Sequence, residues 1–387
     1  MNKNTLIIKL LSSMIICLFI LGSVFPVLGA IKSDQLYGCT NTEPHHYYTY
    51  QEMTDLLQNL SSDHSDIMSI TSIGKTYEGR DIWLVKLSDN VEEDDGEPGV
   101  LLMGAHHGNE KPSFEALIFF IQHVVENYGK ENTDDDGDGI LNEDPVDGVD
   151  NDGDGDVDED PSEDRVRDVV DNTQIFLIPM VNPDGVEYGW RKNRAPNHGP
   201  FGTKDEITSY GVDLNRNYGY KWYLYYILPV QYNLAFTLFD ESWNYRGEYP
   251  FSENETRAVR DFVIGHPNIK ISLSYHSYSE VIMYPWTHTS LKTPDEDLFI
   301  SIGENISKID KYELLINGWR NKSYIIPRFG GTLGTSENWL YGERGILSYT
   351  MELCKTRVPT DPDVVYDYCL KHVGVNLYVC ERSCTID

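Results

Sequence analysis

The chain has few basic residues and few long apolar runs, which argues against a nucleic-acid-binding protein and against a protein with several membrane spans. Its 387 residues include 31 Lys and Arg against 62 Asp and Glu, a formal net charge of -31. Because nucleic acids are bound through clustered Lys and Arg, we expect no nucleic-acid partner. After residue 30, no apolar run approaches the roughly 20 residues that span a bilayer. Attachment to a membrane is therefore expected only if the N-terminal segment is retained.

The chain also lacks the sequence marks of a covalent hydrolase. It has no Gly-x-Ser-x-Gly turn to expose a nucleophilic serine, and no cysteine lies next to an expected base. One of its six cysteines, Cys17, lies in the N-terminal apolar segment, and the others are Cys39, Cys354, Cys369, Cys380 and Cys384. In an oxidising compartment we expect one or two disulfides, with the last three cysteines able to secure the end of a terminal helix. The sequence does not determine the pairing.

Residues 1–30 have the pattern of an export signal. Lys3 and Lys9 precede an apolar stretch from Leu10 to Val27, and small residues suited to cleavage end at Ala30. The alternative is an uncleaved anchor, because the stretch is long for a signal core. Either way we expect the folded part outside the cytoplasm, as a secreted monomer if cleavage occurs. Residues 31–46 are then an N-terminal extension.

Apolar patterns predict strands that alternate with helices. Two β-rich runs, 67–73 and 81–86, are joined by Tyr77-Glu-Gly-Arg80 and predict a hairpin. Further strands are expected at 100–104, 174–180, 270–275, 281–284 and 346–352, and helices at 50–60, 113–128, 253–263, 295–312 and 363–379. This order predicts an α/β fold: a single domain with a central mixed, mostly parallel twisted sheet flanked by helices on both faces.

An acidic insert at residues 131–164 interrupts this pattern. It holds 17 acidic and no basic residues, and the segment Asp134–Pro145 recurs sixteen residues later as Asp150–Pro161. Carboxylates at alternate positions with glycine at the sixth match the first half of an EF-hand-type calcium loop, although proline stands at the twelfth place. The expected calcium ligands are Asp134, Asp136, Asp138, Asp144, Asp150, Asp152, Asp154 and Asp160. The alternative is a solvated, disordered loop.

Four candidate metal-binding or acid–base residues follow predicted strands. His107 and Glu110 come three residues apart after the first buried strand, and His276 and Glu352 stand at the ends of two others. Ligands in open α/β sheets bind outside the carboxyl ends of the strands, so these residues are expected to converge. Taken singly, His276 could be a core histidine and Glu352 could pair with an arginine.

Together with these residues, five short motifs make the chain from residue 47 to about 379 resemble the zinc carboxypeptidases of the A and B type. The motifs are Asn182–Gly185, Trp190–Arg194, Asp213–Arg216, Ser274–Tyr278 and Ser348–Glu352. The resemblance implies a catalytic domain at 47–387 with one zinc held by His107, Glu110 and His276, the His2Glu set already known for carboxypeptidase A.

The same resemblance implies a role for each remaining site residue. Glu352 matches the general base and Arg191 the arginine that stabilises the oxyanion. Asn215 and Arg216 match the pair that binds the substrate's C-terminal carboxylate, which favours an exopeptidase. Asp213 matches the carboxylate that accepts a hydrogen bond from the first zinc histidine.

Substrate contacts are less well matched. Tyr278 is assigned to substrate binding, and Glu337 falls where the basic-specific members carry an acidic pocket residue, which predicts a preference for C-terminal Lys or Arg. Glu337 could instead face a helix N-terminus or solvent. Gly330 stands where the family's mobile tyrosine is expected, so Tyr324 or Phe329 would have to replace it.

We therefore expect a secreted zinc carboxypeptidase that removes C-terminal residues from peptides or proteins. An amidase or murein-peptide hydrolase on the same scaffold is one alternative. A catalytically inactive, calcium-dependent binding module is another, although the presence of all three zinc ligands together with the base speaks against it.

Overall fold

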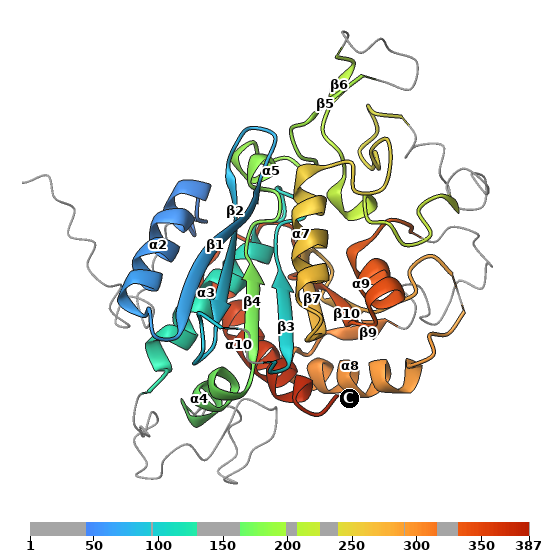
Figure 1. The fold of residues 1–387 in the computed structure, drawn as a ribbon. Helices are drawn as coiled ribbons and strands as arrows, with labels where there is room; N and C mark the ends of the chain where they lie inside the picture. Colours follow the sequence, from blue (N-terminus) through green and yellow to red (C-terminus); the bar gives the residue numbers. More distant parts are fainter. Residues whose placement is uncertain are drawn as a thin grey trace, which may run out of the picture. The chain divides into compact units, whose positions relative to one another are not determined.

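A mixed sheet of eight strands forms the centre of the computed structural model (Figure 1). The structure describes residues 44–93, 96–129, 163–198, 207–224, 239–289, 291–315 and 332–386. Its strands are β1 (Met68–Lys75), β2 (Asp81–Leu87), β3 (Gly99–Met103), β4 (Gln174–Ile178), β7 (Ile269–Ser277), β8 (Val281–Met283), β9 (Glu313–Leu315) and β10 (Leu347–Leu353), with β5 (Pro196–Asn197) and β6 (Ser209–Tyr210) paired separately. The helices are α2 (Tyr50–Asp63), α3 (Pro112–Asn127), α4 (Glu163–Asn172), α5 (Pro183–Glu187), η2 (Leu214–Arg216), α7 (Asn254–Gly265), α8 (Glu296–Asp310), α9 (Ser336–Arg344) and α10 (Pro362–Ser383).

Strand order confirms the mixed α/β sheet expected from the sequence. The order is β1-β2-β4-β3-β7-β10-β8-β9. The predicted hairpin is the antiparallel pair β1–β2, and β4, β3, β7 and β10 run parallel to one another in the middle of the sheet. The carboxyl ends of these four strands therefore lie at one edge, where ligands bind in open α/β sheets.

Each face of the sheet is covered by its own hydrophobic core, because successive side chains of a strand point to opposite faces. In β3, Leu102 packs into the core that contains α3, α8 and α10, whereas Leu101 packs into the core formed with α7 and α9. Figure 1 shows α10 and α7 on opposite sides of the strands. Because the central strands are buried on both faces, β3 and β4 have no exposed residue, as their apolar runs predicted.

Helix boundaries follow from recognisable end signals. Thr49 and Glu52 form a reciprocal capping box at the start of α2, and Asp361 with Pro362 begins α10. Helix α9 was not predicted, since nine residues give a weak periodic signal; α4 overlaps the end of the acidic insert and was missed as well. Among the described residues, none of the helices combines the length and the apolar character needed to cross a bilayer.

The expected disulfide among the last three cysteines is wrong for the described residues. Cys354, Cys369, Cys380 and Cys384 are all free thiols. Helix α10 runs without a break through Cys369 and Cys380, so eleven residues of rise hold these two about 16 Å apart. A disulfide needs Cα atoms within about 7 Å. Cys17 and Cys39 lie outside the described residues.

Candidate metal centre and active site

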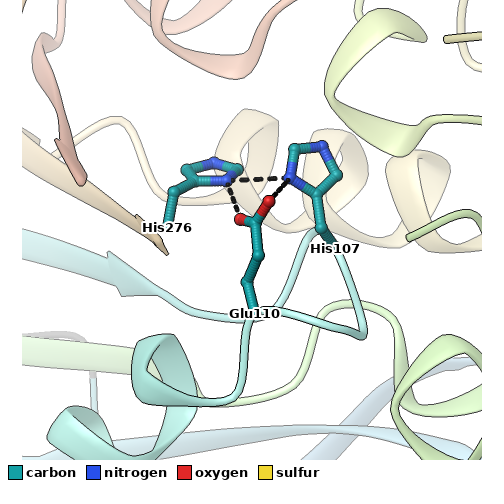
Figure 2. Close-up of side chains that lie close together, drawn as sticks. All are labelled: His107, Glu110 and His276. Carbon is teal, nitrogen blue, oxygen red and sulfur yellow. Dashed lines mark hydrogen bonds and ion pairs between the residues drawn. The ribbon is translucent and has the colours of Figure 1, made fainter. Parts of the chain in front are cut away.

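Three side chains from two distant parts of the chain meet at one point (Figure 2). His107 Nδ1 and His276 Nδ1 each lie 2.9 Å from an oxygen of the Glu110 carboxylate, and the two nitrogens are 3.1 Å apart. All three residues are buried, and their ligand atoms lie within 4.8 Å of one another. The prediction that these donors converge is confirmed.

The strand order explains why His107, Glu110 and His276 lie close together. His107 and Glu110 lie in the turn between β3 and α3, and His276 lies near the end of the neighbouring strand β7. Strand β10 pairs with β7 in parallel, and its register sets Glu352 directly opposite His276. Three adjacent parallel strands thus bring the ligands and the expected base to one edge of the sheet.

The turn that carries His107 and Glu110 depends on close packing of two glycines. A Cβ at Gly108 would lie 2.0 Å from the carbonyl carbon of Gly185, so the two backbones pack against each other. No side chain fits there. The glycine between the two ligands is therefore required by the structure.

A buried carboxylate orients the first histidine. Asp213 is fully buried and accepts hydrogen bonds from His107 Nε2 at 3.1 Å and from Arg191 Nε at 3.0 Å. Burial by itself would raise the pKa of Asp213, but Arg191, Arg216 and His107 outweigh burial and hold this pKa well below its usual range. The carboxylate therefore stays charged and favours the tautomer in which Nδ1 of His107 carries no proton, as a metal ligand requires.

Arg191 lies against the ligands themselves. Its Nη1 is 3.1 Å from His107 Nδ1 and 3.3 Å from Glu110 Oε1, while Nη2 is 2.9 Å from Asp213. These contacts fix the guanidinium and its positive charge next to the ligand atoms.

Loss of solvation shifts the pKa values of Glu352, which is partly buried, and of His276, which is buried. Burial, followed by the charge of Glu110, raises the pKa of Glu352 to about 8, although Arg191 and Arg216 oppose the change. Burial also lowers the pKa of His276, which favours the neutral imidazole that a metal requires. A carboxyl group with a raised pKa is a better proton acceptor, as a general base must be.

Asn215 and Arg216 lie beside this centre in η2. The Asn215 amide nitrogen is 3.3 Å from His276 Nε2, and its oxygen accepts from Ser336 N–H at 2.9 Å. Arg216 donates to the Asn215 carbonyl at 2.6 Å, and its charge opposes, without reversing, the rise that burial causes in the pKa values of Glu337 and Glu352.

Glu337 lies in the first turn of α9, at the helix N-terminus that the alternative named, and only 3% of its surface is exposed, so of that alternative only the solvent-facing position is excluded. Burial raises its pKa, although hydrogen bonds and then Arg216 act against burial. One of its carboxylate oxygens, Oε2, has no hydrogen-bond partner within the described residues.

The remaining predicted site residues are exposed or lie outside the described residues. Tyr278 follows β7 and is 47% exposed, with Arg357 5.7 Å from its ring centroid. Tyr324, Phe329 and Gly330 are outside the described ranges. So are all eight aspartates assigned to calcium, and that assignment stays a prediction.

Sequence reasoning missed several residues that hold the centre together. Ser274 Oγ lies 3.2 Å from His276 Nε2, and its place two residues earlier on the same strand was a usable signal, because such residues share a face. Asn182 donates to the Arg191 carbonyl at 3.2 Å. Asn193 accepts from Val212 N–H at 2.8 Å and so connects the Arg191 segment to the residue before Asp213. No periodic pattern predicts these last two contacts.

Comparison with known proteins decides the family. A family model described as zinc carboxypeptidase matches residues 53–366, most of the chain. The chain belongs to the zinc carboxypeptidase family. A zinc carboxypeptidase of Saccharothrix mutabilis subsp. capreolus is 30% identical over 326 residues, which cover 79% of this chain and 62% of that protein. Carboxypeptidase A1 of Mus musculus is 26% identical over 321 residues, 80% of this chain and 63% of that protein.

Solved structures of carboxypeptidases share the fold. Carboxypeptidase A of Helicoverpa armigera superimposes with a TM-score of 0.64 at 20% identity, covering 87% of this chain and 73% of that one. The chain spans less than two thirds of the length of the first two curated relatives.

Membership of the zinc carboxypeptidase family implies one zinc ion, and the residues present fit it. Catalytic zinc sites use three protein ligands with a water, and two imidazoles with one carboxylate form such a set. Within the described residues, His107, Glu110 and His276 are the sole group of three or more His, Cys, Asp or Glu residues with this geometry.

Proposed function

We propose that this chain is a zinc-dependent carboxypeptidase that hydrolyses the C-terminal peptide bond of peptides or proteins. The observation that supports it most is the convergence of His107, Glu110 and His276 next to Glu352. When bound there, zinc supplies a Lewis acid that lowers the pKa of a water ligand and polarises the scissile carbonyl.

Two side chains of the centre are assigned the proton transfer and the stabilisation of the oxyanion. Glu352, opposite His276 on the neighbouring strand, accepts the proton of the attacking water and later delivers it to the leaving amine. Arg191 stabilises the negative charge on the carbonyl oxygen, since its guanidinium is already held by Asp213 and needs no reorganisation.

Recognition of a free C-terminus is assigned to Asn215 and Arg216. A guanidinium can bind both oxygens of a carboxylate, and Asn215 precedes Arg216 beside His276. This pair favours an exopeptidase, but an amidase on the same scaffold can keep similar residues, so cleavage of a blocked C-terminus is the discriminating observation.

The test measures zinc content and the release of free amino acids by wild type and Glu352→Gln. We expect the variant to retain zinc and to lose at least about 100-fold in kcat, the usual contribution of a general base. Glu343→Gln is the matched control, because Glu343 is exposed on α9 and bonds only Trp339 within the described residues. Unchanged turnover in Glu352→Gln would remove the assigned base.

Peptides that differ only at the C-terminus test the exopeptidase assignment. We expect cleavage of a peptide with a free carboxylate and none of the same peptide with a C-terminal amide. Equal cleavage of both would favour the amidase alternative, and cleavage of neither, with zinc bound, would favour a binding module.

We also propose a preference for C-terminal Lys or Arg. A buried carboxylate with an unpartnered oxygen near Arg216 would provide the charge that a basic side chain needs. Hydrogen bonds to charged groups contribute about 1.5–3 kcal/mol, so Glu337→Gln should lower kcat/KM for Lys peptides by about 10–100-fold and leave Leu peptides unchanged. Wild-type enzyme that releases Phe or Leu as fast as Lys would contradict the preference.

Two further proposals concern residues outside the described ranges. Export with cleavage near Ala30 is tested by N-terminal sequencing of protein from the culture medium. Calcium binding by residues 131–164 is tested by calcium titration of the zinc-loaded protein, with Asp136→Asn and Asp152→Asn as variants. No saturable calcium binding would leave the insert as a solvated acidic loop.

A further inference from the structure

A buried chain of hydrogen-bonding groups runs behind the second zinc histidine. Ser274 Oγ lies 3.2 Å from His276 Nε2 and 3.3 Å from His106 Nδ1, and His106 Nε2 lies 2.8 Å from the Tyr218 hydroxyl. None of His106, Ser274 and Tyr218 is exposed at all. The His106 ring also stacks on the His276 ring, with centroids 5.7 Å apart and planes at 18°. Solvent therefore has no access to the back of His276, and protein groups alone decide where its proton lies.

The geometry of Asn215 shows which neighbour can accept a proton from His276. Nδ1 of His276 faces Glu110 at 2.9 Å, so Nδ1 is the nitrogen that presents its lone pair to a metal, and the proton of the neutral ring must then lie on Nε2. The Asn215 amide also approaches Nε2, but its oxygen is already bonded to Ser336 N–H. The atom of Asn215 that faces Nε2 is therefore the amide nitrogen, which cannot accept a proton from it, so of these two neighbours only Ser274 Oγ can act as the acceptor.

The hydroxyl proton of Ser274 then needs an acceptor of its own. If it pointed at His276 Nε2 it would favour the other tautomer, in which Nδ1 carries the proton and cannot bind a metal. His106 Nδ1 lies on the other side of Ser274 and can accept this proton, while His106 Nε2–H donates to the Tyr218 oxygen. Each link thus has a donor and an acceptor in one consistent direction.

We propose that Ser274 and His106 are positioning residues that hold His276 in its metal-binding tautomer, the role that Asp213 fills for His107. The inference rests on the proposed zinc site. We call the hydrogen-bonded chain from His276 through Ser274 and His106 to Tyr218 the relay. An uncharged relay suits His276 because Glu110 already supplies the negative charge of the ligand set, and a second buried carboxylate would need its own cation. His106, adjacent to a ligand in sequence, thereby acts on the opposite ligand rather than binding the metal itself.

Ser274→Ala is the main test, with Ser272→Ala as its matched control. Ser272 is two residues earlier on the same strand, equally buried, and its hydroxyl has no partner within the described residues. Zinc dissociation constants are measured by chelator competition, and the His276 tautomer by long-range ¹H–¹⁵N NMR of the zinc-stripped and zinc-loaded proteins. Loss of an outer hydrogen-bond partner typically weakens metal binding about 10–100-fold, so we expect that loss in Ser274→Ala and a change below about two-fold in Ser272→Ala.

Variants at His106 separate the relay from simple packing. His106→Leu removes the acceptor for the Ser274 hydroxyl, and we expect weaker zinc binding with more of the Nδ1–H tautomer in the zinc-stripped protein. His106→Gln keeps an acceptor and should restore most of the affinity. If His106→Leu does not fold, the zinc affinity and the tautomer measured in Ser274→Ala decide whether the relay exists.

Unchanged zinc affinity and an unchanged tautomer in Ser274→Ala would overturn the relay. Equal losses in Ser272→Ala and Ser274→Ala would overturn it too, because packing alone would then explain them. These readouts do not depend on turnover. A wild type that binds zinc through the relay but cleaves no peptide would refute the proposed function and leave the relay intact.

Discussion

Asp213→Asn changes one atom of a fully buried side chain and tests how the first zinc histidine is held. The carboxylate accepts from His107 Nε2 on one oxygen and from Arg191 on the other. The amide keeps one acceptor and turns the other into an N–H donor, so that one of the two neighbours faces another donor. In addition, the Arg191 guanidinium, with its side chain 12% exposed, loses its compensating charge.

The size of the effect follows from the burial. Breaking a buried ion pair by removal of one partner costs about 3–5 kcal/mol. Because Arg191 also lies 3.3 Å from Glu110 and keeps part of its compensation, we expect about 3 kcal/mol of lost unfolding free energy in zinc-stripped Asp213→Asn at pH 7. Zinc affinity should fall about 10–100-fold, since His107 loses the group that orients it.

The pH dependence has a definite sign. The pKa of Asp213 is depressed in the folded chain, so its contribution to stability is present above its ordinary pKa and is lost as pH falls through the folded pKa. Asp213→Asn should therefore lose part of the acid dependence that wild type shows below about pH 4.

Urea unfolding of zinc-stripped protein and chelator competition measure the two effects separately. Asp184→Asn is the control, because Asp184 is also fully buried and pairs with Arg80 at 2.7 Å, outside the ligand set. This control should lose stability but keep its zinc affinity within about two-fold. An Asp213→Asn variant with wild-type stability and wild-type zinc affinity would refute the assignment of Asp213.

Three further predictions follow from buried groups near the centre. Burial, followed by the charge of Glu253, raises the pKa of Glu255 to about 8. The unfolding free energy of the wild type should therefore fall as pH rises from about 4.5 to 8. In Glu255→Gln this fall, measured by thermal unfolding, should be smaller by a few kcal/mol. Gly108→Ala places a methyl against the Gly185 backbone and should lower unfolding free energy by at least about 2 kcal/mol, with weaker zinc binding; wild-type values would contradict the close packing. By carboxyl NMR, Glu352 should titrate near 8 in zinc-stripped protein and lower once zinc is bound, since a nearby cation favours the carboxylate; an ordinary pKa without zinc would contradict its burial.

Local patterns were sufficient to predict most elements and the identity of the ligands. The apolar run before His107 predicted β3, and it is buried on both faces as such runs are in parallel sheets. The spacing of His107 and Glu110 placed two donors in one turn, and the strand ends predicted where His276 and Glu352 would be found. These signals are short-range, because side-chain direction repeats every two residues in a strand.

Contacts between distant segments could not be predicted in this way. Nothing in the local pattern states that β10 lies next to β7 with Glu352 opposite His276, or that Asn193 connects the segment of Arg191 to that of Asp213. The expected tail disulfide was wrong, because a continuous helix keeps Cys369 and Cys380 on separate turns although they lie close in sequence.

The amino-acid sequence alone determined the donors, the strands that carry them and the family they indicate. Only the tertiary structure decided which strand lies beside which, and therefore which buried group accepts or donates each proton behind the ligands. The physical reason is that backbone and side-chain periodicity are set by neighbours in the chain. Register and hydrogen-bond direction are set by packing between segments more than a hundred residues apart, as between His106 and Ser274.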